Sequence, residues 1–413
     1  MHFTSESLSP LNHKEFRFYV LMRFFFIMAL RMVATVVAYK LFHLTNDSFA
    51  IGIVGLSEFV PVFVLALYAG HVVDRSDKRT LLLKAIMGYA VCVAILVVLT
   101  LPSIERQLSV TQISSCFYAV IFFTGVIRAF AGPSSNAIIA QLVPRNILQF
   151  AASISSTAWL TASMLGHASA GFLIAYVGVH ATFYVVFGFV LIAAAVLYQI
   201  EKKPAQHANL TVKTWESVKE GLRFVYHHKV MLGAISLDLF AVLFGGAVAL
   251  IPEIASKVLT VGPIGFGWLN AAIDIGSLIM IVAITLIPLK KNQGKLLLFA
   301  VAGFGLCIIV FGLSSWYWLS FAALLIAGML DGISVVIRGT IMQLTTPDEM
   351  RGRVSSVNSM FINSSNELGQ FESGFTARIF GGARPAVLFG GCMTMLVVII
   401  AWFKVKALRK FKY

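Results

Sequence analysis

The sequence predicts an all-α membrane protein in which twelve transmembrane helices form two pseudo-symmetric six-helix bundles. Hydrophobic residues make up 59% of the 413 residues and charged residues only 12%, whereas a typical soluble domain has about 25% charged residues. A bilayer core about 30 Å thick needs about 20 apolar residues for each helical crossing. Apolar blocks of that length recur from Phe16 to Phe403, which predicts a polytopic protein.

The apolar blocks define the expected spans in chain order. Their ranges are 16–41, 50–73, 79–101, 112–141, 148–176, 181–200, 230–251, 262–288, 295–315, 317–344, 354–380 and 385–404. The longest polar connection, 201–229, separates an N-terminal bundle (1–200) from a C-terminal bundle (230–413). Within it Trp215, Val218, Leu222 and Val225 share one helical face, which predicts an amphipathic helix in a cytoplasmic linker.

The positive charge is concentrated on one side of this span map. The net charge is +14, and 22 of the 32 Lys and Arg residues fall on one side of the membrane against five on the other. Basic loops stay in the cytoplasm, so both termini are expected there, which requires an even number of crossings. We expect the basic tail 404–412 to meet anionic membrane lipid. A charge spread over loops in this way favours no nucleic-acid partner.

The two halves carry a short internal repeat. Span 4 is followed by Gln141-Leu142-Val143-Pro144, and span 10 is followed by Gln343-Leu344-Thr345-Thr346-Pro347. An arginine inside the span precedes each copy, Arg128 in the first half and Arg338 in the second. A repeat of six helices predicts a match between spans 4 and 10.

The connection between spans 2 and 3 is a tight basic turn, Gly70-His71-Val72-Val73-Asp74-Arg75-Ser76-Asp77-Lys78-Arg79. Gly70 would allow two helices to approach closely. Asp74 could accept hydrogen bonds at a helix N-terminus, where the helix dipole favours an anion. Its cations also favour a cytoplasmic position for the turn.

This turn resembles the signature loop of the major facilitator superfamily, Gly-x-x-x-Asp-Arg-x-x-basic-basic. Gly70, Asp74, Arg75, Lys78 and Arg79 match that pattern, and Asp77 replaces the usual glycine. The loop acts in that family as a conformational latch between the two halves. The resemblance therefore implies a latch role for these five matching residues.

Two further stretches resemble the branch of that family that contains the bacterial enterobactin exporter and macrolide efflux pumps. They are Gly221-Leu222-Arg223-Phe224 and the segment Gln343 to Val354. The resemblance implies a monomeric secondary transporter of the bacterial inner membrane, working by alternating access. It also implies proton-coupled efflux of an amphipathic small molecule such as a siderophore or a drug.

One departure bears on the direction of coupling. Antiporters of the family carry a Gly-Pro motif in span 5, where this chain has Gly166-His167-Ala168-Ser169-Ala170-Gly171. His167 in the proline position leaves antiport open. The imidazole could titrate near neutral pH, although a histidine of this kind is more often a packing residue. The small residues around it still permit close helix packing.

Ionisable groups inside a bilayer are costly and usually face the bundle interior or a cavity. The candidates for substrate binding or proton coupling are Arg23, Arg31, Glu58, Asp274, Glu367 and His167. Arg128, Asp331 and Arg338 are candidates for structural ion pairs. Asp331 and Arg338 are seven residues apart, so we expect them to interact through a neighbouring group or water. Asp238 and Glu372 are further acidic residues in the spans.

The expected partners are a small-molecule substrate, protons and membrane lipid. The intramembrane arginines make a carboxylate-type siderophore plausible. Two alternatives stay open: transport of a lysophospholipid or other lipid, and a transporter-like receptor without flux. The sequence contains no Gly-x-x-x-x-Gly-Lys-Ser/Thr loop for ATP and no His-Glu-x-x-His motif. We therefore expect neither an enzyme nor a cofactor or metal site.

Overall fold

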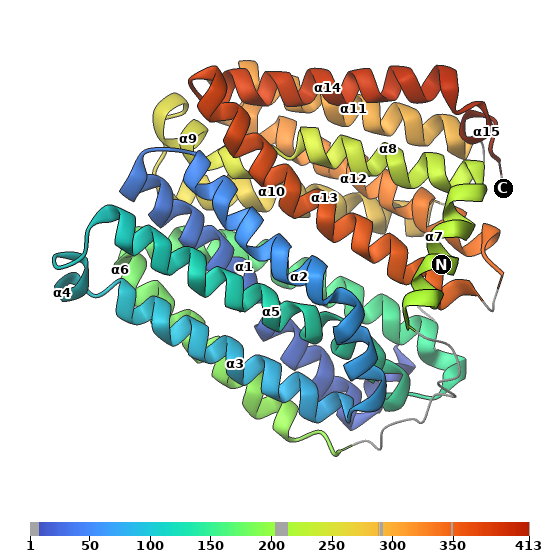
Figure 1. Ribbon diagram of the computed structural model, residues 1–413, viewed down its shortest axis with the longest axis horizontal. Coiled ribbons are helices and arrows are strands. Elements are labelled where there is room, and N and C mark those ends of the chain that lie inside the picture. The colour runs from blue at the N-terminus through green and yellow to red at the C-terminus, as the bar shows by residue number, and fades with distance from the viewer. Residues whose placement is uncertain (1–7, 203–213, 288, 290–291, 348–349, 413) are drawn as a thin grey trace. The chain divides into compact units, whose positions relative to one another are not determined.

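The computed structural model describes residues 8–202, 214–287, 289, 292–347 and 350–412, and these form helices without a β-strand (Figure 1). The α-helices are α1 (Lys14–Thr45), α2 (Phe49–Arg75), α3 (Lys78–Leu99), α4 (Pro102–Glu105), α5 (Val110–Leu142), α6 (Leu148–Tyr198), α7 (Thr214–His227), α8 (Lys229–Gly245), α9 (Ile251–Glu253), α10 (Pro263–Leu286), α11 (Gln293–Leu313), α12 (Tyr317–Thr345), α13 (Arg351–Phe380), α14 (Ala383–Lys404) and α15 (Lys406–Arg409). Short 3₁₀ turns lie at Ser9–Asn12, Arg145–Ile147 and Ala247–Leu250, and a π-helical turn lies at Ile254–Val258.

Ten helical segments of the described chain are long and apolar enough to cross a membrane. One of them contains α6, 51 residues long, in which Gly178 has φ 82° and ψ 169°. A side chain rarely adopts this conformation, so the glycine interrupts the helix and α6 supplies two crossings. The 30-residue α13 supplies one more crossing. It is long enough to span a membrane, and it differs from the ten apolar segments only in its polar residues. The twelve predicted crossings are confirmed in this way.

Local sequence signals set several helix ends. Asp77 caps the N-terminus of α3, where its carboxylate accepts from the backbone N–H of Arg79 (3.2 Å) and Thr80 (3.3 Å). Ser109 and Gln112 form a reciprocal capping box at the start of α5. Gly381, with φ 76°, ends α13 in the left-handed conformation that glycine adopts most easily.

The internal repeat marks two equivalent helix ends. α5 ends at Leu142, and the next residue, Val143, is extended ahead of Pro144. α12 ends at Thr345, and Thr346 is likewise extended ahead of Pro347. A proline disfavours the helical conformation of the residue before it, which explains why the same short motif ends both helices.

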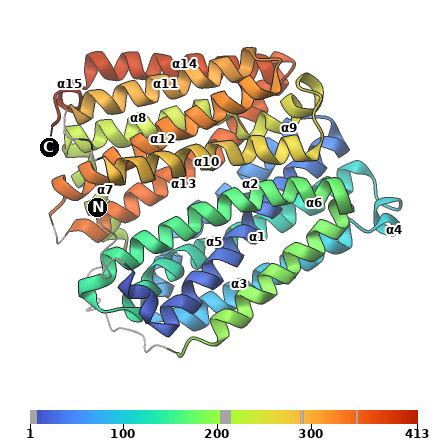
Figure 2. The same ribbon diagram turned by 180° about the vertical axis from the view of Figure 1, so that it is seen from behind.

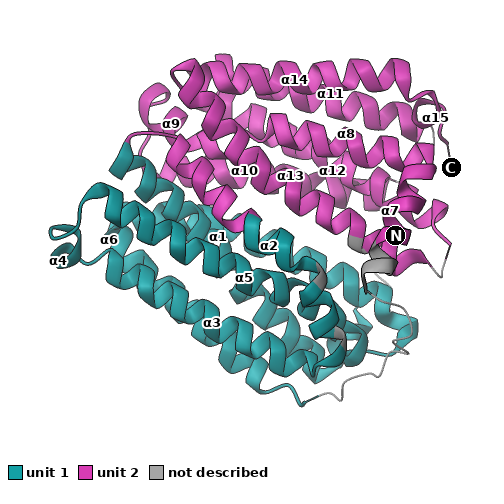
Figure 3. Ribbon diagram, in the orientation of Figure 1, with its two compact units in different colours: residues 1–45, 60–210 teal, residues 46–59, 211–413 magenta. Residues whose placement is uncertain are grey.

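The chain divides into two compact units by its internal contacts (Figure 3). Unit 1 comprises residues 1–45 and 60–210, and unit 2 comprises residues 46–59 and 211–413. The sequence suggests a division only at the 201–229 linker, whereas the contacts also assign the first part of α2 to unit 2. Pro61, just beyond this point, removes one backbone hydrogen bond from α2.

In unit 1, α1 packs along α6, and α3 packs against α5 and α6 (Figure 2). A Cβ atom added to Gly166 would lie 2.8 Å from Cβ of Arg31 and from the carbonyl oxygen of Met28. The predicted close packing around Gly166 is therefore present. The close approach expected at Gly70 is not: within the described structure, a Cβ there would meet nothing within 4 Å.

In unit 2, α10 packs tightly on α12, while α11 contacts α12 and α14 and α8 contacts α13 and α14. The predicted linker helix corresponds to α7. Its Val225 is buried with Val354 and Val357 of α13, and its Glu220 forms an ion pair with Arg353 at 2.5 Å. The described part of this helix is thus held against the start of α13.

Candidate functional site

The centre of unit 2 contains a buried ion pair between α8 and α12. The Arg338 guanidinium contacts the carboxylate of Asp238, and the two side chains are only 9% and 8% exposed. The Nε of Arg338 donates to Oγ of Ser334 at 3.1 Å. Its Nη2 lies 4.0 Å from Oδ1 of Asp331. One guanidinium therefore has two carboxylates within reach, one of them fully engaged.

Asp274 joins these groups from α10. A Cβ at Gly328 of α12 would overlap the backbone of Ile273, so the two helices are in backbone contact one residue before Asp274 and three before Asp331. The carboxylates of Asp274 and Asp331 interact electrostatically, as do those of Asp331 and Asp238. We call Asp238, Asp274 and Asp331 the acidic cluster. Arg338 reaches two of these carboxylates, those of Asp238 and Asp331.

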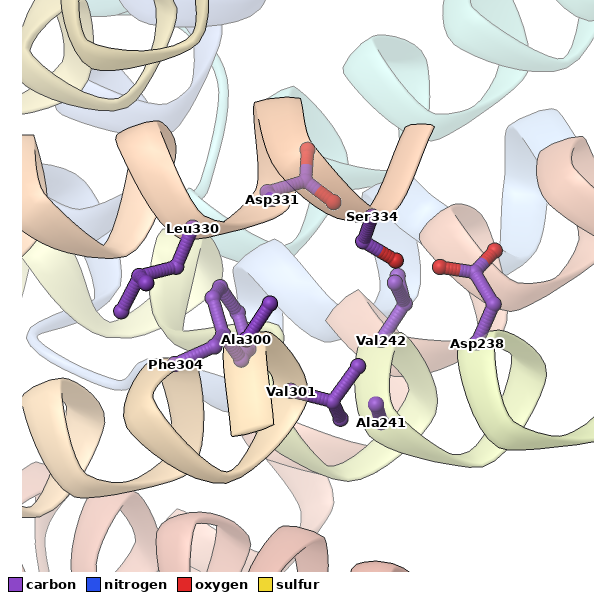
Figure 4. A pocket seen from close by; sticks show the side chains of 9 residues that line it. All are labelled: Asp238, Ala241, Val242, Ala300, Val301, Phe304, Leu330, Asp331 and Ser334. Carbon is purple, nitrogen blue, oxygen red and sulfur yellow. The ribbon is translucent and has the colours of Figure 1, made fainter. Parts of the chain in front are cut away.

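A small pocket lies within this cluster (Figure 4). Asp238 on α8 faces Ser334 and Asp331 on α12 across it, and the rest of its wall is apolar, including Val301, Phe304 and Leu330. Its volume of about 10 Å³ holds roughly one water molecule. The side chain of Asp331 is 35% exposed, so this carboxylate is the accessible member of the pair that contacts Arg338.

The buried partner of Arg338 differs from the one that the sequence predicted. We expected Asp331 and Arg338 to interact through a neighbouring group or water, but the direct and buried partner of Arg338 is Asp238. Asp238 was recognisable only as an acidic residue in a span. Its position 100 residues before Arg338 has no spacing signal, because the pairing depends on how α8 packs against α12.

Two further predicted carboxylates lie where α2 meets α13 in unit 2. A Cβ at Gly55 would come within 2.7 Å of the carbonyl oxygen of Glu367, whose side chain is buried. Glu58 follows Gly55 by three residues and is partly buried. Near the start of the same segment, the Ser48 hydroxyl donates to the buried carboxylate of Glu253 at 2.6 Å. Sequence reasoning missed this last contact.

The arginines predicted in unit 1 are Arg23 and Arg31, candidates for substrate binding or coupling, and Arg128, a candidate for a structural ion pair. Arg23 and Arg31 lie on α1 and Arg128 lies on α5, all partly exposed. The Arg31 guanidinium lies over the ring of Trp159, 5.0 Å from its centroid. Trp159 was not expected to contribute, because an aromatic residue in an apolar span carries no distinctive sequence signal.

His167 links α6 to α1. Its Nδ1 lies 2.6 Å from the hydroxyl of Thr35, and that hydroxyl donates to the carbonyl of Arg31 at 2.9 Å. The hydrogen-bond pattern assigns the Nδ1–H tautomer, because Thr35 then accepts from the ring. His167 is 8% exposed and holds the two helices together beside Arg31.

Within unit 1, Arg79 of the signature loop binds the C-terminal end of α6. Its Nε donates to the carbonyl of Ile200 at 3.0 Å and its Nη2 to that of Tyr198 at 2.7 Å. Both Arg79 and Lys78 are buried, whereas Arg75 is exposed. The side chain of Asp74 lies outside the described part of the structure. The latch role of these residues stays a prediction.

Comparison with known proteins assigns the family. The model of the Major Facilitator Superfamily matches residues 19–370. The chain belongs to the major facilitator superfamily. It is therefore a multi-pass membrane transporter rather than an enzyme, as the resemblance of its loop implied.

The most similar proteins of this family include exporters. An uncharacterized MFS-type transporter, YfiS of Bacillus subtilis (strain 168), is 25% identical over 384 residues, covering 89% of this chain and 87% of the relative. The enterobactin exporter EntS of Shigella flexneri is 23% identical over 390 residues, covering 94% and 87%. The multidrug efflux pump Tap of Mycolicibacterium fortuitum is 24% identical over 353 residues, covering 82% and 84%.

Solved structures share the fold. A bacterial homolog of the human lysosomal transporter Spinster superposes with a TM-score of 0.74 at 14% identity, covering 97% of this chain and 98% of that one. The D-xylose-proton symporter superposes with a TM-score of 0.75 at 14% identity, covering 95% and 98%. At this identity, the similarity establishes the twelve-helix fold of the family and no substrate.

Proposed function

We propose that this transporter exports an amphipathic small molecule, such as a siderophore or a drug, in exchange for protons. The acidic cluster is the observation that carries the proposal. Charged side chains at membrane depth are costly and mark ion and proton pathways. Arg338 contacts two carboxylates, Asp238 and Asp331, and Asp274 acts electrostatically on Asp331, so the cluster has capacity to bind and release protons within unit 2.

Arg338 supplies a means of coupling. In the structure it is engaged by Asp238, with Asp331 4.0 Å from its Nη2. Protonation of Asp238 would remove the charge that holds the guanidinium, and Arg338 would then turn to Asp331. Such an exchange alters how α8 is held to α12, and it would link protonation to a rearrangement within unit 2.

The names of the relatives and the charge pattern support the proposed direction and substrate class. EntS and Tap are named as an exporter and an efflux pump. The basic loops support a bacterial inner-membrane protein with both termini in the cytoplasm, acting as a monomer. The intramembrane arginines of unit 1 favour a molecule with an acidic group, which suits a carboxylate-type siderophore.

A deletion strain tests the direction and the substrate. We expect a small acidic molecule to accumulate inside the deletion strain and to decrease in the medium, relative to the parent, under iron-poor growth. Accumulation under iron-rich growth as well would favour a drug-like or metabolic substrate. Loss of lysophospholipid movement, with no soluble molecule altered, would instead favour the lipid transporter.

Inverted membrane vesicles test the coupling. With an inside-acid pH gradient, we expect uptake of the identified molecule to depend on the gradient, and Asp331→Asn to abolish this dependence. Glu201→Gln is the matched control, because Glu201 is exposed and lies beyond the end of α6. Uptake by Asp331→Asn and Asp274→Asn that still responds fully to the gradient would remove the cluster from the coupling mechanism.

A further inference from the structure

The charges inside the membrane helices are divided between the two units. Three arginines of unit 1 lie more than two turns from either end of their helix: Arg23, Arg31 and Arg128. Every described acidic residue of unit 1 lies at or next to a helix end, namely Glu15, Asp74, Asp77, Glu105 and Glu201. In unit 2, by contrast, Arg338 faces the acidic cluster. Unit 1 therefore has an excess of positive charge at membrane depth.

Arg23 is held by neutral groups. Its Nη1 donates to the hydroxyl of Tyr19 at 2.9 Å and to Oγ of Ser135 at 2.8 Å, with Oδ1 of Asn136 at 3.5 Å. Its Nε is buried without a hydrogen-bond acceptor among the described residues. The guanidinium is thus fixed in orientation by α1 and α5, but its charge is not neutralised by these contacts.

Arg31 is also held without a carboxylate. Its guanidinium lies over Trp159, and its backbone is fixed by the Thr35 and His167 hydrogen bonds and by the close approach of Gly166. Among the described residues, no acceptor bonds its guanidinium N–H groups. A cation–π contact satisfies one face of a guanidinium and leaves its in-plane donors available.

We propose that Arg23 and Arg31 form the binding site for the acidic groups of the transported molecule, an amphipathic organic anion. This proposal rests on the proposed transport function and names its substrate class. A guanidinium presents a planar pair of donors that matches a carboxylate or other oxyanion. A bound anion would supply the charge and the acceptors that both arginines lack, and Trp159 would border its apolar part.

The spacing of the two arginines constrains the ligand. Eight helical residues correspond to about 12 Å along α1. A small inorganic anion can therefore reach only one guanidinium, whereas an extended molecule with two acidic groups could engage both. The side chains of Arg23, Arg31 and Trp159 are partly exposed, and Asn136, with Oδ1 3.5 Å from Nη1 of Arg23, is exposed, so these groups are accessible to a ligand.

Binding to the purified full-length protein tests the proposal without any proton gradient. The probes are pyrenebutyrate and pyrenebutanol, which share an aromatic body and differ in the carboxylate. We expect the protein to bind the carboxylate at least tenfold more tightly. Because the single carboxylate of pyrenebutyrate can engage only one guanidinium at a time, we expect the double variant Arg23→Gln with Arg31→Gln to weaken carboxylate binding about tenfold and to change alcohol binding less than twofold. Lys84→Gln, at an exposed position on α3, is the charge-matched control and should change neither.

Arg31→Lys in the Arg23→Gln background separates binding from folding. It keeps the charge but loses the planar donor pair, so we expect intermediate carboxylate affinity with an unchanged elution profile in gel filtration. Equal affinity of the wild-type protein for both probes would overturn the proposal, as would an equal loss of both probes in the double glutamine variant. Because no gradient is used, failure of proton coupling in vesicles would not affect this binding result. Failure of probe binding would likewise not affect the test of proton coupling.

Discussion

Arg338 and Asp238 form an ion pair between α12 and α8 in which each side chain is less than one-tenth exposed. Asp331 lies about two helical turns before Arg338 on α12 and reaches the same guanidinium at 4.0 Å. Buried pairs contribute less net stability than their contact suggests, because both ions lose their hydration. In the proposed coupling, the alternative partner would allow Arg338 to change its contact without becoming isolated.

Breaking this pair from one side should be more harmful than removing it. We expect Arg338→Met alone to lower the free energy of unfolding by about 3 kcal/mol, because it leaves the Asp238 charge buried and uncompensated. The double variant Arg338→Met with Asp238→Leu should recover most of that loss. Thermal unfolding of the detergent-solubilised proteins measures both. Additive losses in the double variant would show that the two residues act independently.

The N-cap of α3 predicts a small and specific effect at Asp77. We expect Asp77→Ala to lower stability by about 1 kcal/mol, because the backbone N–H groups of Arg79 and Thr80 lose their acceptor. Asp77→Gly introduces the residue usual in the signature loop and should lower stability by only a few tenths of a kcal/mol relative to the wild-type protein. Unfolding midpoints of the two variants test this. A glycine variant less stable than the alanine variant would contradict the capping role.

Arg79 should act on stability and Arg75 should not. Arg79→Met removes two charged hydrogen bonds to the end of α6, so we expect a loss of about 3 kcal/mol in the free energy of unfolding. Arg75→Met, at an exposed position, should stay within about 0.5 kcal/mol. If Arg75→Met nevertheless abolishes transport while its unfolding curve is unchanged, the latch prediction for that residue is supported. Full transport by the variant would refute it.

A larger side chain at the glycine contact between α13 and the first part of α2 should weaken the packing of these two segments. A Cβ at Gly374 would lie 2.9 Å from Cα of Gly52 and from the carbonyl oxygen of Ser48. We expect Gly374→Leu to cost about 1–3 kcal/mol through overpacking and to accelerate amide hydrogen exchange in residues 46–59. Gly188→Leu is the control, because a Cβ there meets nothing within 4 Å. Equal exchange in both variants would show that the contact does not hold this segment.

Much of the fold follows from local sequence signals. The lengths of the apolar blocks predict the crossings, Asp77 and Ser109 mark helix starts, and the paired Gln-Leu-Pro segments mark equivalent helix ends. These features depend on backbone hydrogen bonding and on the thickness of the bilayer. Both act on residues that are close in sequence, so they can be read without knowing the packing.

The candidate sites could be predicted only as a set of charged positions. The sequence identifies Arg31, Asp274, Asp331 and Arg338 as ionisable residues in spans, because such groups are rare at membrane depth.

The tertiary structure decided which groups are neighbours. It pairs Asp238 with Arg338, places the Trp159 ring against Arg31 and assigns residues 46–59 to unit 2. A helical pattern shows which face of a helix is polar, but the neighbour of that face is set by the packing of helices far apart in the chain.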